Sequence, residues 1–192
     1  MRYSPKHKEK TRAHILKTTG SLVKKNGFAA TGVDSLMAAA NLTSGAFYAH
    51  FKSKSDLLEA IVENELQHSI EQFTNQSLEK SLLAIDRYLS LPHVANPETG
   101  CLIPSLAPEI ARASKATQLK FEHGIIELKN QIKELTADDA TAWSMTTQLI
   151  GAVMIARGMA SEQTQIDLLT GVHQQIKQML AGKQNADSPI KD

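Results

Sequence analysis

Apolar residues recur at intervals of three and four along almost the whole chain, and this spacing is the period of an amphipathic α-helix. No segment alternates apolar and polar residues convincingly over the length of a strand, and no internal repeat is visible. Apolar residues make up 42% of the 192 residues, enough for a core, whereas aromatic residues make up only 5%. The sequence therefore predicts an all-α fold and argues against parallel-sheet folds.

Glycine, proline and capping residues separate the predicted helices. In chain order these helices span residues 8–26, 31–40, 44–51, 53–73, 77–91, 101–113, 115–135, 136–159 and 164–180. We expect Thr31 and Ser44 to cap the second and third helices, and Thr136 or Asp139 to cap the eighth. Residues 1–10 are expected to form a mobile basic arm, and residues 183–192 a disordered tail.

The net charge of +1 hides an asymmetry between the two ends of the chain. Residues 1–60 hold ten Lys and Arg against four Asp and Glu, a net charge of +6, and residues 61–192 hold eleven against sixteen, a net charge of −5. Clustered cations neutralise phosphates, so a basic head on an acidic body favours a DNA-binding module attached to another domain. The alternative on charge alone is that the cations cluster by chance.

Several other classes of protein are disfavoured by the sequence. Cys101 is the only cysteine, which excludes an intrachain disulfide and a structural zinc cluster. No secretory signal is visible, and the longest apolar stretch, Leu149–Ala160, is too short to span a bilayer and contains Arg157. We therefore expect a soluble cytoplasmic protein. The seven histidines are scattered, and no catalytic motif is present, so we expect no enzyme activity, no cofactor and no metal.

Two short helices joined by a tight turn, over residues 33–51, point most directly to a function. Phe47 and Phe51 are four residues apart and are expected to face inward. The outward residues of the second short helix are mostly small, which would let this helix enter the major groove of DNA. Ala46 or Ala49 would pack on a thymine methyl, while Tyr48 and His50 would hydrogen-bond a phosphate or a base edge.

The wider sequence around this pair resembles the signature of the TetR family. The resemblance covers about fifty residues and rests on Gly27-Phe28, Thr31, Val33-Asp34-Ser35-Leu36, Ala39-Ala40-Asn41-Leu42, Ser44-Gly45-Ala46-Phe47-Tyr48, His50-Phe51, Lys54 and Leu57-Leu58. It implies about nine helices, a homodimer and a ligand cavity in a larger C-terminal domain. The domains would span residues 1–54 and 55–182, followed by the tail 183–192.

The resemblance also implies how DNA would be bound. The helix 44–51 would read the major groove, and Thr31, Tyr48 and Lys54 would hold phosphates. Because Ala46 and Ala49 are small, sequence discrimination would depend on a few polar residues and on DNA shape. The full set of predicted DNA contacts is Thr31, Thr43, Ser44, Gly45, Ala46, Tyr48, Ala49, His50, Lys52 and Lys54.

One segment of the C-terminal part adds a narrower resemblance. Gly100-Cys101-Leu102-Ile103, Leu106-Ala107 and Glu109-Ile110 resemble a segment of a TetR subgroup that includes electrophile- and quinone-sensing repressors. The resemblance implies that Cys101 is a sensor thiol, although Pro104 and Pro108 depart from many such sequences. The alternative is that Cys101 is a small buried apolar residue.

The effector site and the dimer interface are the remaining sites that we predict. The candidates for an effector pocket are large or reactive side chains, and the alternative for each is plain core: Phe73, Cys101, Phe121, Trp143 and Met154. The last two predicted helices carry broad apolar faces, which would form a four-helix dimer interface or else be buried core. The candidate interface residues are Ala142, Leu149, Ala152, Val153, Ala156, Leu169, His173, Ile176 and Leu180.

These features together predict a repressor that binds double-stranded DNA as a homodimer. Its recognition helices would lie about one DNA turn apart on a palindromic operator, and a small-molecule effector of unknown identity would release it. Two alternatives remain at this point: an all-helical carrier or enzyme with an incidental helix-turn-helix, and an effector-free architectural protein that binds DNA without sequence preference.

Overall fold

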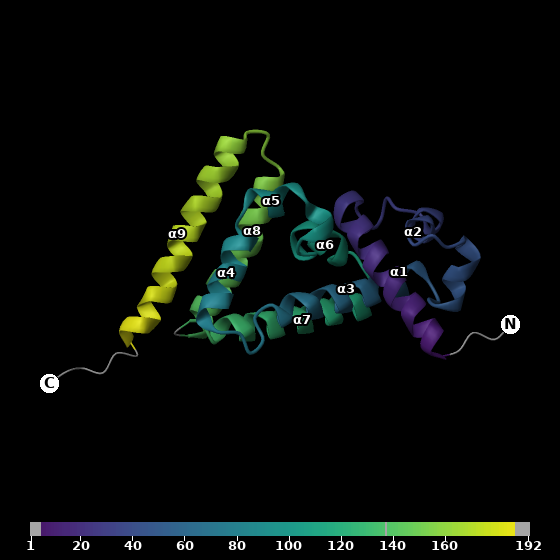
Figure 1. Cartoon of the computed structure of the whole chain (residues 1–192), viewed down its shortest axis with the longest axis horizontal. Coiled ribbons are helices and arrows are strands. Elements are labelled where there is room, and N and C mark those ends of the chain that lie inside the picture. Colours follow the sequence, from purple (N-terminus) through teal and green to yellow (C-terminus); the bar gives the residue numbers. More distant parts are fainter. Residues whose placement is uncertain (1–4, 137, 187–192) are drawn as a thin grey trace. The chain divides into compact units, whose positions relative to one another are not determined.

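A computed structural model describes residues 5–136 and 138–186 of the chain (Figure 1). Over these residues it contains α-helices, two short 3-10 helices and no strand, which confirms the predicted all-α fold. The elements are α1 (Pro5–Asn26), α2 (Val33–Ala39), η1 (Ser44–Ala49), α3 (Lys54–Glu71), α4 (Leu78–Tyr88), α5 (Leu91–Ala95), η2 (Pro97–Thr99), α6 (Ile103–Ile110), α7 (Lys115–Lys133), α8 (Asp139–Arg157) and α9 (Glu162–Ala186).

The chain forms two compact units. The first unit contains the described residues up to Gln67 together with Pro97–His123, so that α6 and the first half of α7 belong with the N-terminal helices. The second unit contains His68–Asn96 and the described residues from Gly124 onward. The predicted boundary at residue 54 separates a DNA-binding domain from an effector-binding domain, and it stays a prediction.

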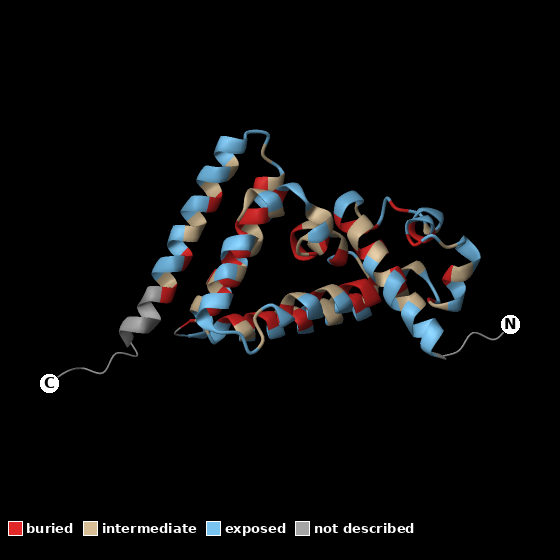
Figure 2. Cartoon of the chain, in the orientation of Figure 1, coloured by how far each residue is buried: buried red, intermediate tan, exposed pale blue. Residues whose placement is uncertain are grey.

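The core of the first unit lies where α1, α2, η1 and α3 meet (Figure 2). Thr19 is a polar residue in this core, and its hydroxyl is satisfied by donating to the carbonyl of Ile15 at 2.7 Å. Apolar side chains from all four elements fill the remaining space, namely Ile15, Val23, Leu36, Met37, Phe47, Phe51, Leu57, Leu58, Ile61 and Val62. This shared core fixes η1 against α1 and α3.

The first unit differs from the sequence prediction at three helix boundaries. α1 begins at Pro5 and not at residue 8, because proline is well suited to the first helical position; residues 1–4 of the predicted arm lie outside the described residues. Gly32, not Thr31, precedes α2. Residues Ser44–Ala49 form a 3-10 helix and not the predicted α-helix, and this helix ends two residues before Phe51.

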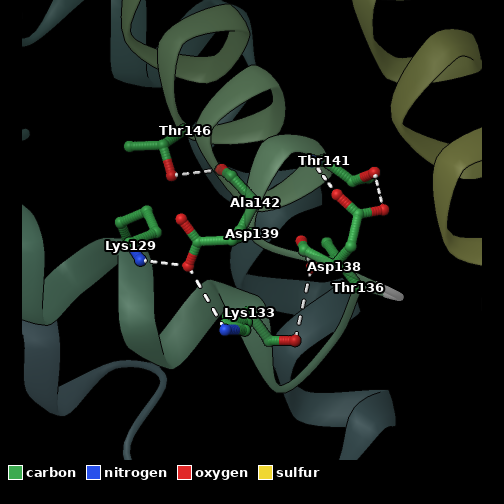
Figure 3. Close-up of polar contacts among 8 residues, drawn as sticks. All are labelled: Lys129, Lys133, Thr136, Asp138, Asp139, Thr141, Ala142 and Thr146. Atoms are coloured by element: carbon green, nitrogen blue, oxygen red, sulfur yellow. Dashed lines mark hydrogen bonds and ion pairs between the residues drawn. The ribbon is translucent and has the colours of Figure 1, made fainter.

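Helix α8 of the second unit begins at a cluster of polar side chains (Figure 3). The predicted cap, Thr136, instead donates to the carbonyl of Asp138, whose carboxylate caps the helix by accepting the N–H of Thr141 at 2.9 Å. The neighbouring Asp139 lies 2.6 Å from the ammonium of Lys129, a buried lysine of α7. This ion pair fixes the corner between α7 and α8.

Two further boundaries in the second unit differ from those predicted. The expected helix 77–91 ends at Tyr88, and Ser90 then caps the short α5, which has proline in its first turn. Helix α9, which lies antiparallel beside α8 in Figure 1, continues to Ala186. Residues 183–186 of the predicted tail are therefore helical, because no proline interrupts the helix before Pro189. Residues 187–192 lie outside the described residues.

Candidate nucleic-acid interface

Two buried aromatic residues, Phe47 within η1 and Phe51 just after it, anchor this short helix to the core. Phe47 and Phe51 are each only 1% exposed, and their ring centres lie 5.8 Å apart. Before η1, Asn41 adopts a left-handed backbone with φ of 55°, a conformation that asparagine tolerates better than most residues. The tight turn and the inward aromatic pair are as predicted, and they turn the opposite face of η1 outward.

The outward face of η1 consists of small residues around one tyrosine. Tyr48 is 74% exposed, and its ring meets the Phe47 ring edge-on at 5.2 Å. The Ser44 hydroxyl donates to the carboxylate of Asp34, which ties η1 to α2. Four of the remaining predicted DNA contacts in this region are exposed, namely Thr43, Gly45, Ala49 and Lys52. The other two, Ala46 and His50, are half-buried.

Thr31 and Lys54 meet at the turn between α1 and α2. Thr31 is buried, and its hydroxyl donates to the carbonyl of Gly27 at 2.6 Å. The ammonium of Lys54 donates to the carbonyl of Ala29 at 3.2 Å and lies 4.7 Å from the centre of the Phe28 ring. The structure thus brings these two predicted phosphate contacts together at one turn, 23 residues apart in sequence.

Sequence reasoning missed Arg12 as part of this interface. Its guanidinium carbon lies 4.4 Å from the centre of the Phe51 ring, and the Nη1 atom is buried without a hydrogen-bond partner. The Nδ1 atom of His50 is likewise buried without a partner. The signal in the sequence was the four-residue spacing of Lys8 and Arg12, which places both cations on one face of α1.

The cations on α1 also influence the titration of His50. Burial lowers the pKa of His50 below 6.5, and the positive charges of Lys8, Arg12 and His7 lower it further. A phosphate placed beside this cluster would offset the mutual repulsion of the cations. The arrangement is therefore suited to an anion.

The five effector candidates are divided between the two units. Cys101 and Phe121 belong to the first unit, and both are half-buried. Phe73, Trp143 and Met154 belong to the second, where Trp143 and Met154 are exposed on α8. Their role in an effector pocket stays a prediction.

A groove of about 200 Å³ opens in the second unit beside α9. Its lining includes Asp86 and His173, and the carboxylate of Asp86 lies 2.6 Å from Nε2 of His173. Apolar side chains and one threonine complete its lining, and no effector candidate is among them: Leu89, Leu91, Ile166, Leu169 and Thr170.

Nearly all the predicted dimer-interface residues lie inside a single chain. Helices α8 and α9 bury them against their own protomer, and each is at most 7% exposed: Ala142, Leu149, Ala152, Val153, Ala156, Leu169, Ile176 and Leu180. His173 is half-buried. The exposed face of α8 carries other residues, among them Trp143, Thr147, Met154 and Ile155. At Gly151 a side chain would meet nothing within 4 Å.

Within residues 5–136 and 138–186, none of the helices combines the length and the apolar character needed to cross a membrane.

Comparison with known proteins finds a family model that matches the helix-turn-helix. A sequence model described as "Bacterial regulatory proteins, tetR family" matches residues 15–61. The uncharacterized HTH-type transcriptional regulator YerO of Bacillus subtilis (strain 168) is 39% identical over 61 residues. That match covers 32% of this chain and 21% of YerO, so the chain spans about a fifth of the length of this curated relative.

Solved structures resemble the chain over most of its length. E. coli NemR in its reduced form has a TM-score of 0.73 at 18% identity, over 88% of this chain and 96% of that one. A TetR-family transcriptional regulator from Cytophaga hutchinsonii has a TM-score of 0.72 at 20% identity, over 100% of both chains. A TetR transcriptional regulator from Legionella pneumophila has a TM-score of 0.69 at 22% identity, over 93% and 98%. At these identities the likeness is one of fold.

Proposed function

We propose that the protein is a homodimeric transcriptional repressor released from its operator by a small molecule, on the premise that residues 15–61 match the TetR-family model. The observation that carries the proposal is the outward face of η1. Its small residues surround an exposed Tyr48 and are held rigidly by Phe47 and Phe51. A rigid face with small side chains fits the major groove, where base edges are distinguishable.

Two cations lie in the same unit as this face and are held in place by other residues. Lys54 is fixed at the turn between α1 and α2, and Arg12 stacks on the ring of Phe51. Contacts of this kind would fix the register of the protein on the phosphate backbone, while the residues of η1 would read bases and groove shape. Because a repressor acts on chromosomal DNA, we place the protein in the cytoplasm.

We propose that the dimer forms through the outward faces of α8 and α9. These faces carry exposed apolar residues on α8, including Trp143 and Met154, and the open positions Gly151 and Gly171, where a second helix can approach closely. The residues predicted for this role are at most 7% exposed within the protomer, apart from the half-buried His173. Sedimentation equilibrium tests the proposal: Gly151→Glu should yield monomers, and an intact Gly151→Glu dimer would place the interface elsewhere.

Two places in the structure are proposed to sense an effector. The groove beside α9 offers leucine side chains and the Asp86–His173 pair, which suits a small apolar molecule with one polar group. Cys101 offers a half-buried thiol next to Gly100, whose carbonyl accepts from the ammonium of Lys24 at 2.9 Å. The thiolate is the form of cysteine that reacts with electrophiles, and Cys101 is the thiol that we propose for this reaction.

A gel-shift titration against the DNA upstream of the protein's own gene tests the regulator proposal. We expect a discrete complex that survives excess non-specific competitor at about 150 mM salt, since specificity is meaningful only at stated ionic strength. A complex that competitor removes would favour the architectural alternative, and genome-wide binding selection would then distinguish it from a distant operator. The absence of any complex with DNA would overturn the proposal in favour of a helical carrier or enzyme.

A further inference from the structure

Glu109, near the end of α6, binds the backbone of the turn between α1 and α2. Its Oε1 atom accepts the N–H of Phe28 at 3.0 Å, and its Oε2 atom accepts the N–H of Ala29 at 2.6 Å. Both oxygens of one carboxylate are thus engaged by successive backbone groups, and such charge-assisted hydrogen bonds are stronger than neutral ones. The residues that this contact joins lie 80 positions apart in the sequence.

Gly27 allows the carboxylate to come this close. Its backbone has φ of +81°, a left-handed conformation that glycine adopts without cost. A Cβ atom at position 27 would lie 2.9 Å from Oε1 of Glu109. The backbone conformation favours glycine at this position, and the missing side chain leaves room for the carboxylate of Glu109.

The same turn holds the two predicted phosphate contacts. Thr31 bonds to it twice, through its hydroxyl to the carbonyl of Gly27 and through its N–H to the carbonyl of Phe28 at 3.2 Å. Lys54 donates to the carbonyl of Ala29 and lies over the ring of Phe28. Whatever fixes this turn also fixes the position of Thr31 and Lys54.

A second polar contact anchors the segment that leads into α6. Lys24 of α1 is 7% exposed, and its ammonium lies 2.6 Å from the carboxylate of Glu65 and 2.9 Å from the carbonyl of Gly100. The chain from Gly100 to Glu109 is therefore attached to α1 at its start and to the turn after α1 at its end. α6 cannot shift along α1 without breaking one of these contacts.

We propose that Glu109 is a positioning residue for DNA binding, which holds the turn Gly27–Thr31 so that Lys54 meets a phosphate at a fixed position. This role rests on the proposed DNA-binding function. It makes DNA affinity depend on the placement of α6, a helix that has no predicted contact with DNA itself.

Substitution of Glu109 separates this role from simple electrostatics. Removing a negative charge strengthens the attraction between a protein and DNA, so electrostatics alone predicts tighter binding by Glu109→Gln. We expect the opposite, with operator affinity about tenfold weaker, because one of the two bonds to the turn is lost. Glu109→Asp keeps the charge but shortens the side chain, and should weaken binding as well. Glu122→Gln, an equal charge change at an exposed position of α7, should not weaken binding.

Two readouts distinguish positioning from general destabilisation. In the protein without DNA, amide hydrogen exchange at Phe28 and Ala29 should become faster in Glu109→Gln, while exchange at Ile61 in the core stays slow. In the Lys54→Ala background the loss of affinity caused by Glu109→Gln should shrink, since Glu109 acts partly through Lys54. In the Tyr48→Ala background the loss should keep its full size, because Tyr48 takes no part in the turn.

The results separate this inference from the proposed function. If the unsubstituted protein forms no competitor-resistant complex with operator DNA, the proposed function fails and the role of Glu109 fails with it. If the unsubstituted protein binds and both Glu109 variants bind equally well, only the role of Glu109 is overturned. Full additivity with Lys54→Ala, or unchanged exchange at Phe28 and Ala29, would also overturn it.

Discussion

The guanidinium of Arg12 stacks on the ring of Phe51, so that one aromatic side chain closes the core of the first unit and supports a cation at its surface. The stacking leaves Nη1 buried and without a partner. We expect Arg12→Ala to weaken DNA binding for all sequences alike and to reduce the salt slope of the affinity by about one, as for the loss of one phosphate contact. Filter binding at several salt concentrations measures both. Lys17→Ala, which removes an exposed charge of α1, is the matched control, and an equal effect in both variants would contradict the stacked site.

Tyr48 and Lys54 should each be needed for DNA binding but not for assembly. Tyr48→Ala removes the exposed side chain of η1, and Lys54→Ala removes the cation from the turn between α1 and α2. We expect each to lower operator affinity by about tenfold, while sedimentation still shows dimers. Unchanged affinity in both variants would refute the proposed mode of docking.

DNA affinity should depend on pH through His50. Its pKa in the free protein lies below 6.5, and a bound phosphate would raise the pKa in the complex. Binding would then take up a proton, so affinity should be highest below the free-protein pKa and fall as pH rises through the pKa of the complex. We expect His50→Gln to flatten this dependence between about pH 5.5 and 8. His14→Gln should leave it intact, and equal flattening in both variants would assign the proton elsewhere.

The Asp139–Lys129 pair should stabilise the second unit in a pH-dependent way. Hydrogen bonds from Lys129 and Lys133 hold the pKa of Asp139 below 3.8 (Figure 3). A carboxylate with a lowered pKa stabilises the fold above its unfolded pKa, and this contribution is lost as pH falls through the folded value. We expect Asp139→Asn to lower the melting temperature at pH 7, because buried Lys129 loses its partner. The difference in melting temperature between this variant and the unsubstituted protein should narrow below pH 3.8. Asp167→Asn, on the exposed side of α9, should have little effect; equal melting of the two variants at pH 7 would contradict the prediction.

Cys101 should react with quinones or similar electrophiles if it is the sensor. Because it is the only cysteine, a single adduct in the intact mass assigns the reaction to its thiol. The modified protein should lose its operator complex, and Cys101→Ser should show neither adduct nor release. A protein that stays unmodified under conditions that label an exposed thiol would leave the groove beside α9 as the proposed effector site.

The sequence predicts the structural features that depend on residues close together along the chain. The spacing of Phe47 and Phe51 predicted an inward pair, and both side chains are buried. The contacts of Arg12 with Phe51 and of Glu109 with the turn join residues far apart, and no periodicity within one helix indicates such pairs. For the same reason the prediction for α8 was ambiguous. Apolar residues such as Val153 reveal a face that must be buried, but not whether the chain itself or a partner buries it.

The contacts of the first unit join residues on both sides of position 54, which matters for any exchange of domains with another protein. A head cut at residue 54 would keep Lys24 but lose both Glu65 and the carbonyl of Gly100, which leaves a buried ammonium without its partners. The turn after α1 would also lose Glu109. A chimera that transplants the proposed DNA-binding residues onto another protein therefore has to include α6 and the segment from Gly100 that leads into it. The unit of recombination in this protein is discontinuous in sequence.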